Sequence, residues 1–166
     1  MAKTETVLQI SKFFLLDDVA LVKLNAHIQF TDGVQLACLP EQGSELEIGD
    51  GCFATGWGET RGSGSDEFLK QVKQVVVMES ECGSDKYNPK TQICVRNYRN
   101  TPCIGDSGGP LVCKKEDGKW YVFGATSQST LVNGIAALCA TPDLNFLFAK
   151  ILDKANWIKF TIENNK

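Results

Sequence analysis

The sequence is poor in histidine, with His27 alone among 166 residues, and it contains no Cys-x-x-Cys pair. Zinc sites in proteins are commonly built from cysteine and histidine ligands at such short spacings, so we expect no metal site. Long apolar runs are also missing, because charged residues interrupt every candidate, and we expect no membrane span. The net charge of -3 provides no basic surface for nucleic acid, so we expect no nucleic-acid partner.

The N-terminus lacks the apolar core of a signal peptide. Cysteine, in contrast, is abundant for so short a chain, and the count of seven is odd. At least one sulfur therefore has no partner within the chain. Disulfides would indicate an oxidising compartment and hence a missing upstream segment, whereas buried free thiols of a cytosolic protein are the alternative. The cysteines are Cys38, Cys52, Cys82, Cys94, Cys103, Cys113 and Cys139.

Short apolar stretches separated by turn residues run from Val7 to Ile158, a pattern typical of an all-β sandwich or barrel. Asp117 and Gly118 stand between two such stretches and predict a β-hairpin. Only the end of the chain has helical periodicity, which predicts a terminal helix packed on the body of the domain. The apolar positions of this helix are Ile151, Ala155, Ile158 and Ile162.

The stretch GDSGGP, residues 105–110, is the strongest candidate for chemistry. Glycines on both sides of Ser107 permit tight turns and free backbone N–H groups to face a developing negative charge. A glycine-rich turn without chemistry is the plain alternative. The Gly-x-Ser-x-Gly elbow of α/β-hydrolases is another, but it requires a helix after the serine, and residues 110–113 are typical of a strand.

Several further motifs occur in the same order and at the same intervals as in one known family. The chain resembles the chymotrypsin/trypsin-like serine proteases, peptidase family S1, over nearly its whole length. The Gly-Trp-Gly-Glu-Thr motif at residues 56–60 is similar to that of plasminogen-like members. The stretches that carry the resemblance are DVALVKL (18–24), ACLP (37–40), CFATGWGET (52–60), CIGDSGGPLVC (103–113) and NWI (156–158).

The resemblance implies an all-β, chymotrypsin-like double β-barrel that lacks most of its first barrel and ends in a C-terminal α-helix. All-β double domains usually need about 200 to 250 residues, so the chain is identified as N-terminally truncated. Residues 1–166 would form one S1-like domain. Within it, residues 1–36 would be the remnant of the first barrel, residues 37–150 the second barrel and residues 151–166 the C-terminal helix.

The resemblance also implies the roles of individual residues in endopeptide hydrolysis through an acyl-enzyme, without a cofactor. Ser107 would be the nucleophile, and the N–H groups of Gly105 and Ser107 would form the oxyanion hole. Asp18 would be the buried carboxylate that orients the catalytic imidazole. Asp106 would pair with the N-terminal amine that zymogen cleavage creates. The expected partners are protein or peptide substrates, and the expected location is secreted or extracellular.

The family pattern pairs six of the cysteines in disulfides. It leaves Cys38 alone, and in two-chain members the matching cysteine bonds to a preceding segment outside the protease body. The odd cysteine count then indicates an absent partner segment. The implied disulfides are Cys52–Cys113, Cys82–Cys94 and Cys103–Cys139.

The histidine of the family is where the resemblance fails. It precedes the acid-bearing strand in the family, and this chain begins after that point. His27 lies nine residues after Asp18 and matches no histidine motif. Without a general base a serine is a poor nucleophile, so we expect this chain to be nearly inactive alone. The alternative is a non-catalytic, protease-like binding domain.

The expected substrate-binding residues also depart from the trypsin pattern. Thr101 occupies the position six before the nucleophile, where trypsin-like members carry an aspartate, so no preference for Lys or Arg is expected. Ser127 would line the cleft. Gln128 and Ser129 follow it where Trp and Gly are usual, and together with Ile104 they predict a neutral, small to medium apolar side chain in the pocket.

Overall fold

The computed structural model describes residues 8–41, 43–60, 67–83, 87–97, 99–132, 135–136 and 145–166. The β-strands are β1 (Ile10–Leu16), β2 (Val19–Leu24), β3 (Gly51–Gly56), β4 (Lys70–Val76), β5 (Gln92–Arg96), β6 (Pro110–Lys114), β7 (Trp120–Ser129), β8 (Leu131–Val132), β9 (Ile135–Ala136) and β10 (Asn145–Lys150). The helices are the 3-10 turns η1 (Glu79–Glu81) and η2 (Leu152–Lys154) and the α-helix α1 (Ala155–Glu163).

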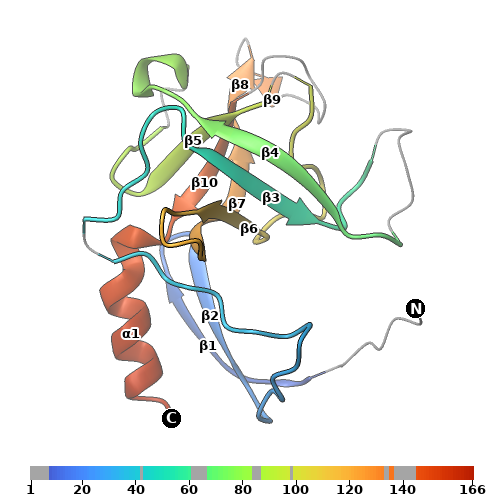
Figure 1. The fold of residues 1–166 in the computed structure, drawn as a ribbon, viewed down its shortest axis with the longest axis vertical. Coiled ribbons are helices and arrows are strands. Elements are labelled where there is room, and N and C mark those ends of the chain that lie inside the picture. The colour runs from blue at the N-terminus through green and yellow to red at the C-terminus, as the bar shows by residue number, and fades with distance from the viewer. Residues whose placement is uncertain are drawn as a thin grey trace.

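A closed barrel forms the centre of the molecule, with its strands in the order β10-β5-β4-β3-β6-β7 (Figure 1). Each pair of neighbours is antiparallel, and β6 and β7 form the hairpin that the Asp-Gly turn predicted. Alternate residues of these strands point into the barrel, as Cys52 and Ala54 do in β3 and Leu111 and Cys113 do in β6. The predicted all-β class is therefore confirmed.

The hairpin of β1 and β2 is a separate two-stranded sheet. Cross-strand partners share a face, and the pair Leu16 and Val19 faces the body of the molecule, with Val19 buried. The other face carries apolar side chains that remain largely open to solvent: Phe13 is 64%, Leu15 75% and Val22 43% exposed. Apolar sheet faces of this kind are usually covered in a folded protein.

Helix α1 packs along the inner face of the β1–β2 hairpin, as Figure 1 shows at the C-terminal end. Ile158 of the helix and Val19 of β2 belong to one apolar cluster, together with Ile151. The predicted C-terminal helix is confirmed, but its buried face differs at the end, because Thr161 is buried and Ile162 is 53% exposed. The α-helix is also shorter than the predicted 151–166, because Leu152–Lys154 form the 3-10 turn η2.

Two disulfides of the expected pattern are present. Cys52–Cys113 joins neighbouring residues of β3 and β6, and Cys82–Cys94 joins the end of η1 to β5. Cys103 is also disulfide-bonded, but the expected partner Cys139 lies outside the described residues. Cys38 is a half-buried free thiol.

Within the described residues, no helix has the length and apolar character needed to cross a membrane.

Candidate active site

Ser107 lies in a tight turn between the loop of residues 101–104 and strand β6. Gly105 and Gly108 adopt φ values of 95° and 77°, a left-handed region that favours glycine. The N–H of Gly109 donates to the Asp106 carbonyl at 2.9 Å, which closes the turn. Two backbone hydrogen bonds hold the turn against β7. The Gly108 N–H donates to the Thr126 carbonyl at 2.9 Å, and the Thr126 N–H donates to the Gly109 carbonyl at 2.8 Å. In this turn Ser107 is exposed to solvent.

The carboxylate of Asp106 accepts hydrogen bonds from two backbone donors. The N–H of Gly58 donates to Oδ1 at 2.8 Å, and the N–H of Cys103 donates to Oδ2 at 2.9 Å. Gly56 and Gly58 have no side chain, and a Cβ at either position would overlap the Asp106 carboxyl group. The two glycines therefore make room for this carboxylate next to the barrel.

The peptide between Ile104 and Gly105 has a defined orientation. Its carbonyl accepts a hydrogen bond from the Glu59 N–H at 2.7 Å. Because a trans peptide is planar with its C=O and N–H opposed, the Gly105 N–H points away from Glu59. No hydrogen bond among the described residues uses the N–H of Gly105 or of Ser107. The turn thus offers two backbone donors that no described acceptor occupies.

Substitution of Gly58 by alanine is expected to destabilise this site. The new methyl group would displace the Asp106 carboxyl from its two donors, and such overpacking typically costs about 1 to 3 kcal/mol. Chemical denaturation of Gly58→Ala beside Gly33→Ala measures the effect, since a Cβ on Gly33 meets no atom within 4 Å. Equal stability of the two variants would contradict the tight packing of Asp106.

Asp18 occupies the turn between β1 and β2. Its neighbour Val19 shares an apolar cluster with Ala125 of β7. Ala125 pairs in turn with Pro110, the last residue of the GDSGGP stretch. The strand that follows Asp18 and the serine turn therefore both contact the same part of β7. The expectation of a buried Asp18 is wrong for this chain: the residue is exposed, because none of the described elements covers the β1–β2 turn from its outer side.

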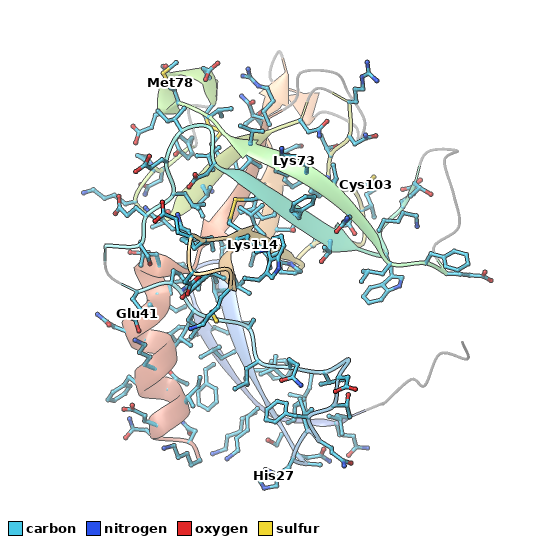
Figure 2. All side chains as sticks on the ribbon, in the orientation of Figure 1. His27, Glu41, Lys73, Met78, Cys103 and Lys114 are labelled. Carbon is cyan, nitrogen blue, oxygen red and sulfur yellow. A yellow bond between two sulfur atoms is a disulfide. The ribbon has the colours of Figure 1, made fainter. Side chains whose placement is uncertain are left out.

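His27 lies beyond the opposite end of the hairpin from Asp18 (Figure 2). Six residue steps lead from Asp18 along β2 to Leu24, and at about 3.3 Å per residue they place some 20 Å between these two residues. The chain does not turn back from there, and Figure 2 shows the His27 side chain at that far end of the hairpin. The His27 imidazole is therefore outside hydrogen-bond reach of the Asp18 carboxylate, as its mismatch to the family motif predicted.

A cavity of about 460 Å³ lies behind the serine turn, bounded by residues 54–60, 70–72 and 100–103. Of the expected site residues, Thr101 and Asp106 line it. Thr126 of β7 closes one side, and its hydroxyl donates to the Gly109 carbonyl at 2.9 Å. The cavity therefore adjoins the serine turn through Asp106 and Thr126.

The other expected substrate-binding residues lie outside this cavity's lining. Ser127, Gln128 and Ser129 form the end of β7, where Ser127 and Ser129 are half-buried and Gln128 is exposed. Ile104 projects from the serine turn and is 72% exposed. Strand β10 supports the end of β7, with Phe146 opposite Ser129.

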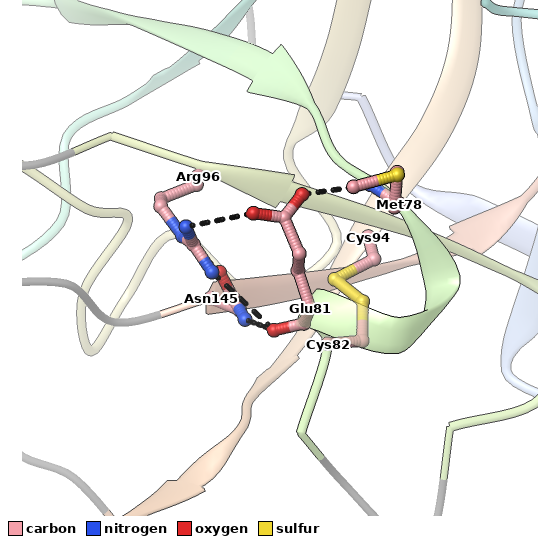
Figure 3. A network of polar contacts seen from close by, with 6 residues as sticks. All are labelled: Met78, Glu81, Cys82, Cys94, Arg96 and Asn145. Atoms are coloured by element: carbon pink, nitrogen blue, oxygen red, sulfur yellow. Dashed lines mark hydrogen bonds and ion pairs between the residues drawn. A yellow bond between two sulfur atoms is a disulfide. The ribbon is translucent and has the colours of Figure 1, made fainter. Parts of the chain in front are cut away.

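A polar network fixes the start of β10 beside these residues (Figure 3). The Arg96 Nε donates to Asn145 Oδ1 at 2.6 Å, while its guanidinium pairs with Glu81 at 3.4 Å. The Asn145 side-chain amide donates to the Glu81 carbonyl, and the Asn145 main-chain carbonyl accepts from the Thr130 N–H at 3.0 Å. The network therefore anchors the strand that backs Ser129.

Three positioning residues were not anticipated from the sequence: Gly58, Glu59 and Thr126. The Gly-Trp-Gly pattern at 56–58 is a signal that could have indicated a close backbone approach at Gly58. Glu59 and Thr126 act largely through main-chain groups, which leave no side-chain signal. Among the described residues there is no group of three or more His, Cys, Asp or Glu side chains suited to hold a metal ion.

Comparison with known proteins finds the family described as Trypsin over residues 3–158. Chymotrypsin-C of Rattus norvegicus is 32% identical over 159 residues, which are 92% of this chain and 58% of the relative. Chymotrypsin-like elastase family member 3A of Homo sapiens is 42% identical over 119 residues, 67% of this chain and 43% of the relative. Family member 3B of Macaca mulatta is 36% identical over 157 residues, 90% of this chain and 58% of the relative.

The chain thus spans about half the length of these relatives. The plasminogen-like subgroup gains no support from them. The serine turn, the closed barrel and the family match over residues 3–158 agree with one another. The chain belongs to the chymotrypsin/trypsin-like family of serine proteases.

Proposed function

We propose that this chain carries the nucleophile, the oxyanion hole and the acid of a serine endopeptidase site. The observation that supports this most is the orientation of the Ile104–Gly105 peptide, whose carbonyl is held by Glu59 at 2.7 Å. That orientation leaves the Gly105 N–H directed away from Glu59, on a turn that also exposes Ser107. Such preorganised donors are what acyl transfer requires.

In the proposed reaction the Ser107 Oγ attacks the scissile carbonyl carbon, and the carbonyl oxygen becomes an oxyanion. The N–H groups of Gly105 and Ser107 would hydrogen-bond this oxyanion, and one such donor typically contributes about 3 to 4 kcal/mol to the transition state. The amine leaves with a proton, the acyl-enzyme ester remains on Ser107, and water then hydrolyses the ester. Asp18 would hold the imidazole that carries the proton between these groups.

The general base is the part of the site that this chain does not supply. Its one histidine, His27, lies beyond reach of Asp18. Without a base to take its proton, the hydroxyl of Ser107 is a poor nucleophile. We therefore propose that the chain alone turns over peptides very slowly. Full activity would need the part of the relatives that this chain does not match.

The substrate class follows from the residues around the serine turn. Thr101 provides no charge to pair with Lys or Arg. We therefore propose substrates that place a neutral, small to medium apolar side chain in the binding pocket. The carboxylate of Asp106, at the wall of the cavity, is suited to receive an N-terminal amine after activation. Cys38 would join a separate segment by a disulfide, and the disulfides of the barrel support a secreted or extracellular location.

A second candidate is a non-catalytic, protease-like binding domain. The distance of His27 from Asp18 and the side chains at Gln128 and Ser129 favour this alternative. The retained Ser107, Asp18 and Asp106 favour the endopeptidase.

A fusion protein separates the two functions. The stretch of rat chymotrypsin-C that this chain does not match would be joined to the chain, so that the family's histidine-bearing half is supplied. We expect a fluorophosphonate to label Ser107 in the fusion and no label in its Ser107→Ala variant. An unlabelled but folded fusion would rule out the endopeptidase and leave the binding domain.

A further inference from the structure

A buried lysine lies where the C-terminal helix begins. Lys154 is 1% exposed, which is rare for a lysine unless its charge is paired. Its Nζ lies 2.8 Å from Asp153 Oδ2 and 3.2 Å from Asp17 Oδ2. Asp153 is the adjacent residue, whereas Asp17 belongs to the β1–β2 turn. One ammonium group therefore links the start of α1 to that turn.

The residue that Lys154 holds has an unusual backbone. Asp17 adopts a φ of 49°, the one left-handed non-glycine residue among those described. Such a conformation carries a cost that surrounding contacts must offset. Burial lowers the pKa of Lys154, but the hydrogen bonds that its ammonium donates to Asp153 and Asp17 outweigh this effect and leave the pKa above its ordinary value. The ammonium is therefore charged at neutral pH.

The rest of the hairpin is attached to the same helix. At the far end of β2 the Lys23 ammonium donates to the Asn165 carbonyl, just past the end of α1. Between these two polar contacts, Val19 packs with Ile158 in one apolar cluster. The hairpin is thus held along its length, and Asp18 lies between the ion-paired Asp17 and the buried Val19.

We propose that Lys154 is a positioning residue for Asp18, holding the Asp17–Asp18 turn at a fixed place on the start of the C-terminal helix. The proposal rests on the proposed function for its catalytic meaning. Its structural part concerns this chain alone. Asp18 is exposed, and within the described part of the chain its side chain makes no hydrogen bond or ion pair, so its position depends on its neighbours, the ion-paired Asp17 and the buried Val19.

Hydrogen exchange of the full chain tests the structural part. Asp17→Asn removes the charge and suits the left-handed backbone, since asparagine tolerates it well. Lys154→Met keeps the apolar stem. The Asp17 side chain is 61% exposed, so solvent screens part of the attraction. We expect both variants to speed exchange in β1 and β2 by about fivefold to tenfold, with β3 and β6 unchanged.

Asp153→Asn is the matched control, because Asp153 contacts the same ammonium at the shorter distance but lies beside it in the chain. It should leave exchange in the hairpin within about twofold of the unsubstituted chain. Equal effects of Asp17→Asn and Asp153→Asn, or no change in the hairpin for either Asp17→Asn or Lys154→Met, would overturn the proposal.

The fusion with the unmatched part of chymotrypsin-C tests the catalytic part. Misplacing a catalytic group by about 1 Å can cost on the order of 100-fold, so Lys154→Met and Asp17→Asn should lower kcat by 10-fold to 100-fold with KM unchanged. Asp153→Asn should keep kcat. A normal kcat with a loosened hairpin would reject the positioning role. An inactive parent fusion would reject the proposed function, and the exchange result would still decide whether Lys154 holds the turn.

Discussion

Replacement of Ser107 by alanine is expected to leave the residual peptidase activity of this chain unchanged. The members of a catalytic triad act as a unit, and loss of the base alone reduces turnover about as much as loss of all three members, by about 10⁶-fold. Because His27 cannot reach Asp18, the chain already lacks the base. Hydrolysis of an activated ester and of a peptide anilide by the chain and by Ser107→Ala would measure this.

The same substitution is expected to have the opposite outcome in the fusion that supplies the family's histidine. There Ser107→Ala should lower turnover by about 10⁶-fold, because the serine now acts with its base. A large effect of Ser107→Ala in the chain alone would show that another group accepts the proton, and it would contradict the assignment of His27 as a bystander.

Removal of the disulfide between Cys52 and Cys113 is expected to give the largest loss of stability. The two residues are 61 apart in sequence, and closing a loop of this length constrains the unfolded chain by about 4 kcal/mol in the chain-entropy account. Both sulfurs are replaced together, by Cys52→Ala and Cys113→Ala, so that no thiol is left unpaired. Urea unfolding gives the change in the free energy of unfolding.

The disulfide between Cys82 and Cys94 provides the matched comparison, because it closes a loop of only 12 residues. The same account gives about 3 kcal/mol for its removal by the paired alanine substitutions. Both disulfides are buried in the structure, so cavity effects are similar in kind. A greater loss from the short loop would indicate that packing around the sulfurs, rather than loop closure, governs the stability of the barrel.

The barrel and the serine turn could be predicted because their signals are local. The Asp-Gly turn at 117–118 predicts the β6–β7 hairpin, and apolar stretches of strand length predict the all-β class. The glycines around Ser107 predict a tight turn, and two of them, Gly105 and Gly108, adopt left-handed conformations. These features depend on the conformational preferences of a few adjacent residues.

The exposure of Asp18 and the buried face of α1 could not be read in the same way. Whether an aspartate is covered depends on elements distant in sequence, and here the described elements leave its turn open. The helix pattern predicted Ile162 as a core position, but in the structure Thr161 is buried and Ile162 is 53% exposed. Local periodicity indicates that one face is apolar, while the packing partner decides which residues that face includes.

By itself, the sequence determined the all-β class, the glycine-bounded serine turn and the presence of a single histidine. Only the tertiary structure decided how the turn's peptide groups are oriented, that Gly58 admits the Asp106 carboxylate, and that the charge of Lys154 is buried against Asp17. The physical reason is the separation of the interacting residues along the chain. Turn and strand preferences arise between neighbouring residues, whereas a hydrogen bond from Glu59 to Ile104 or an ion pair from η2 to the β1–β2 hairpin forms only when distant segments meet.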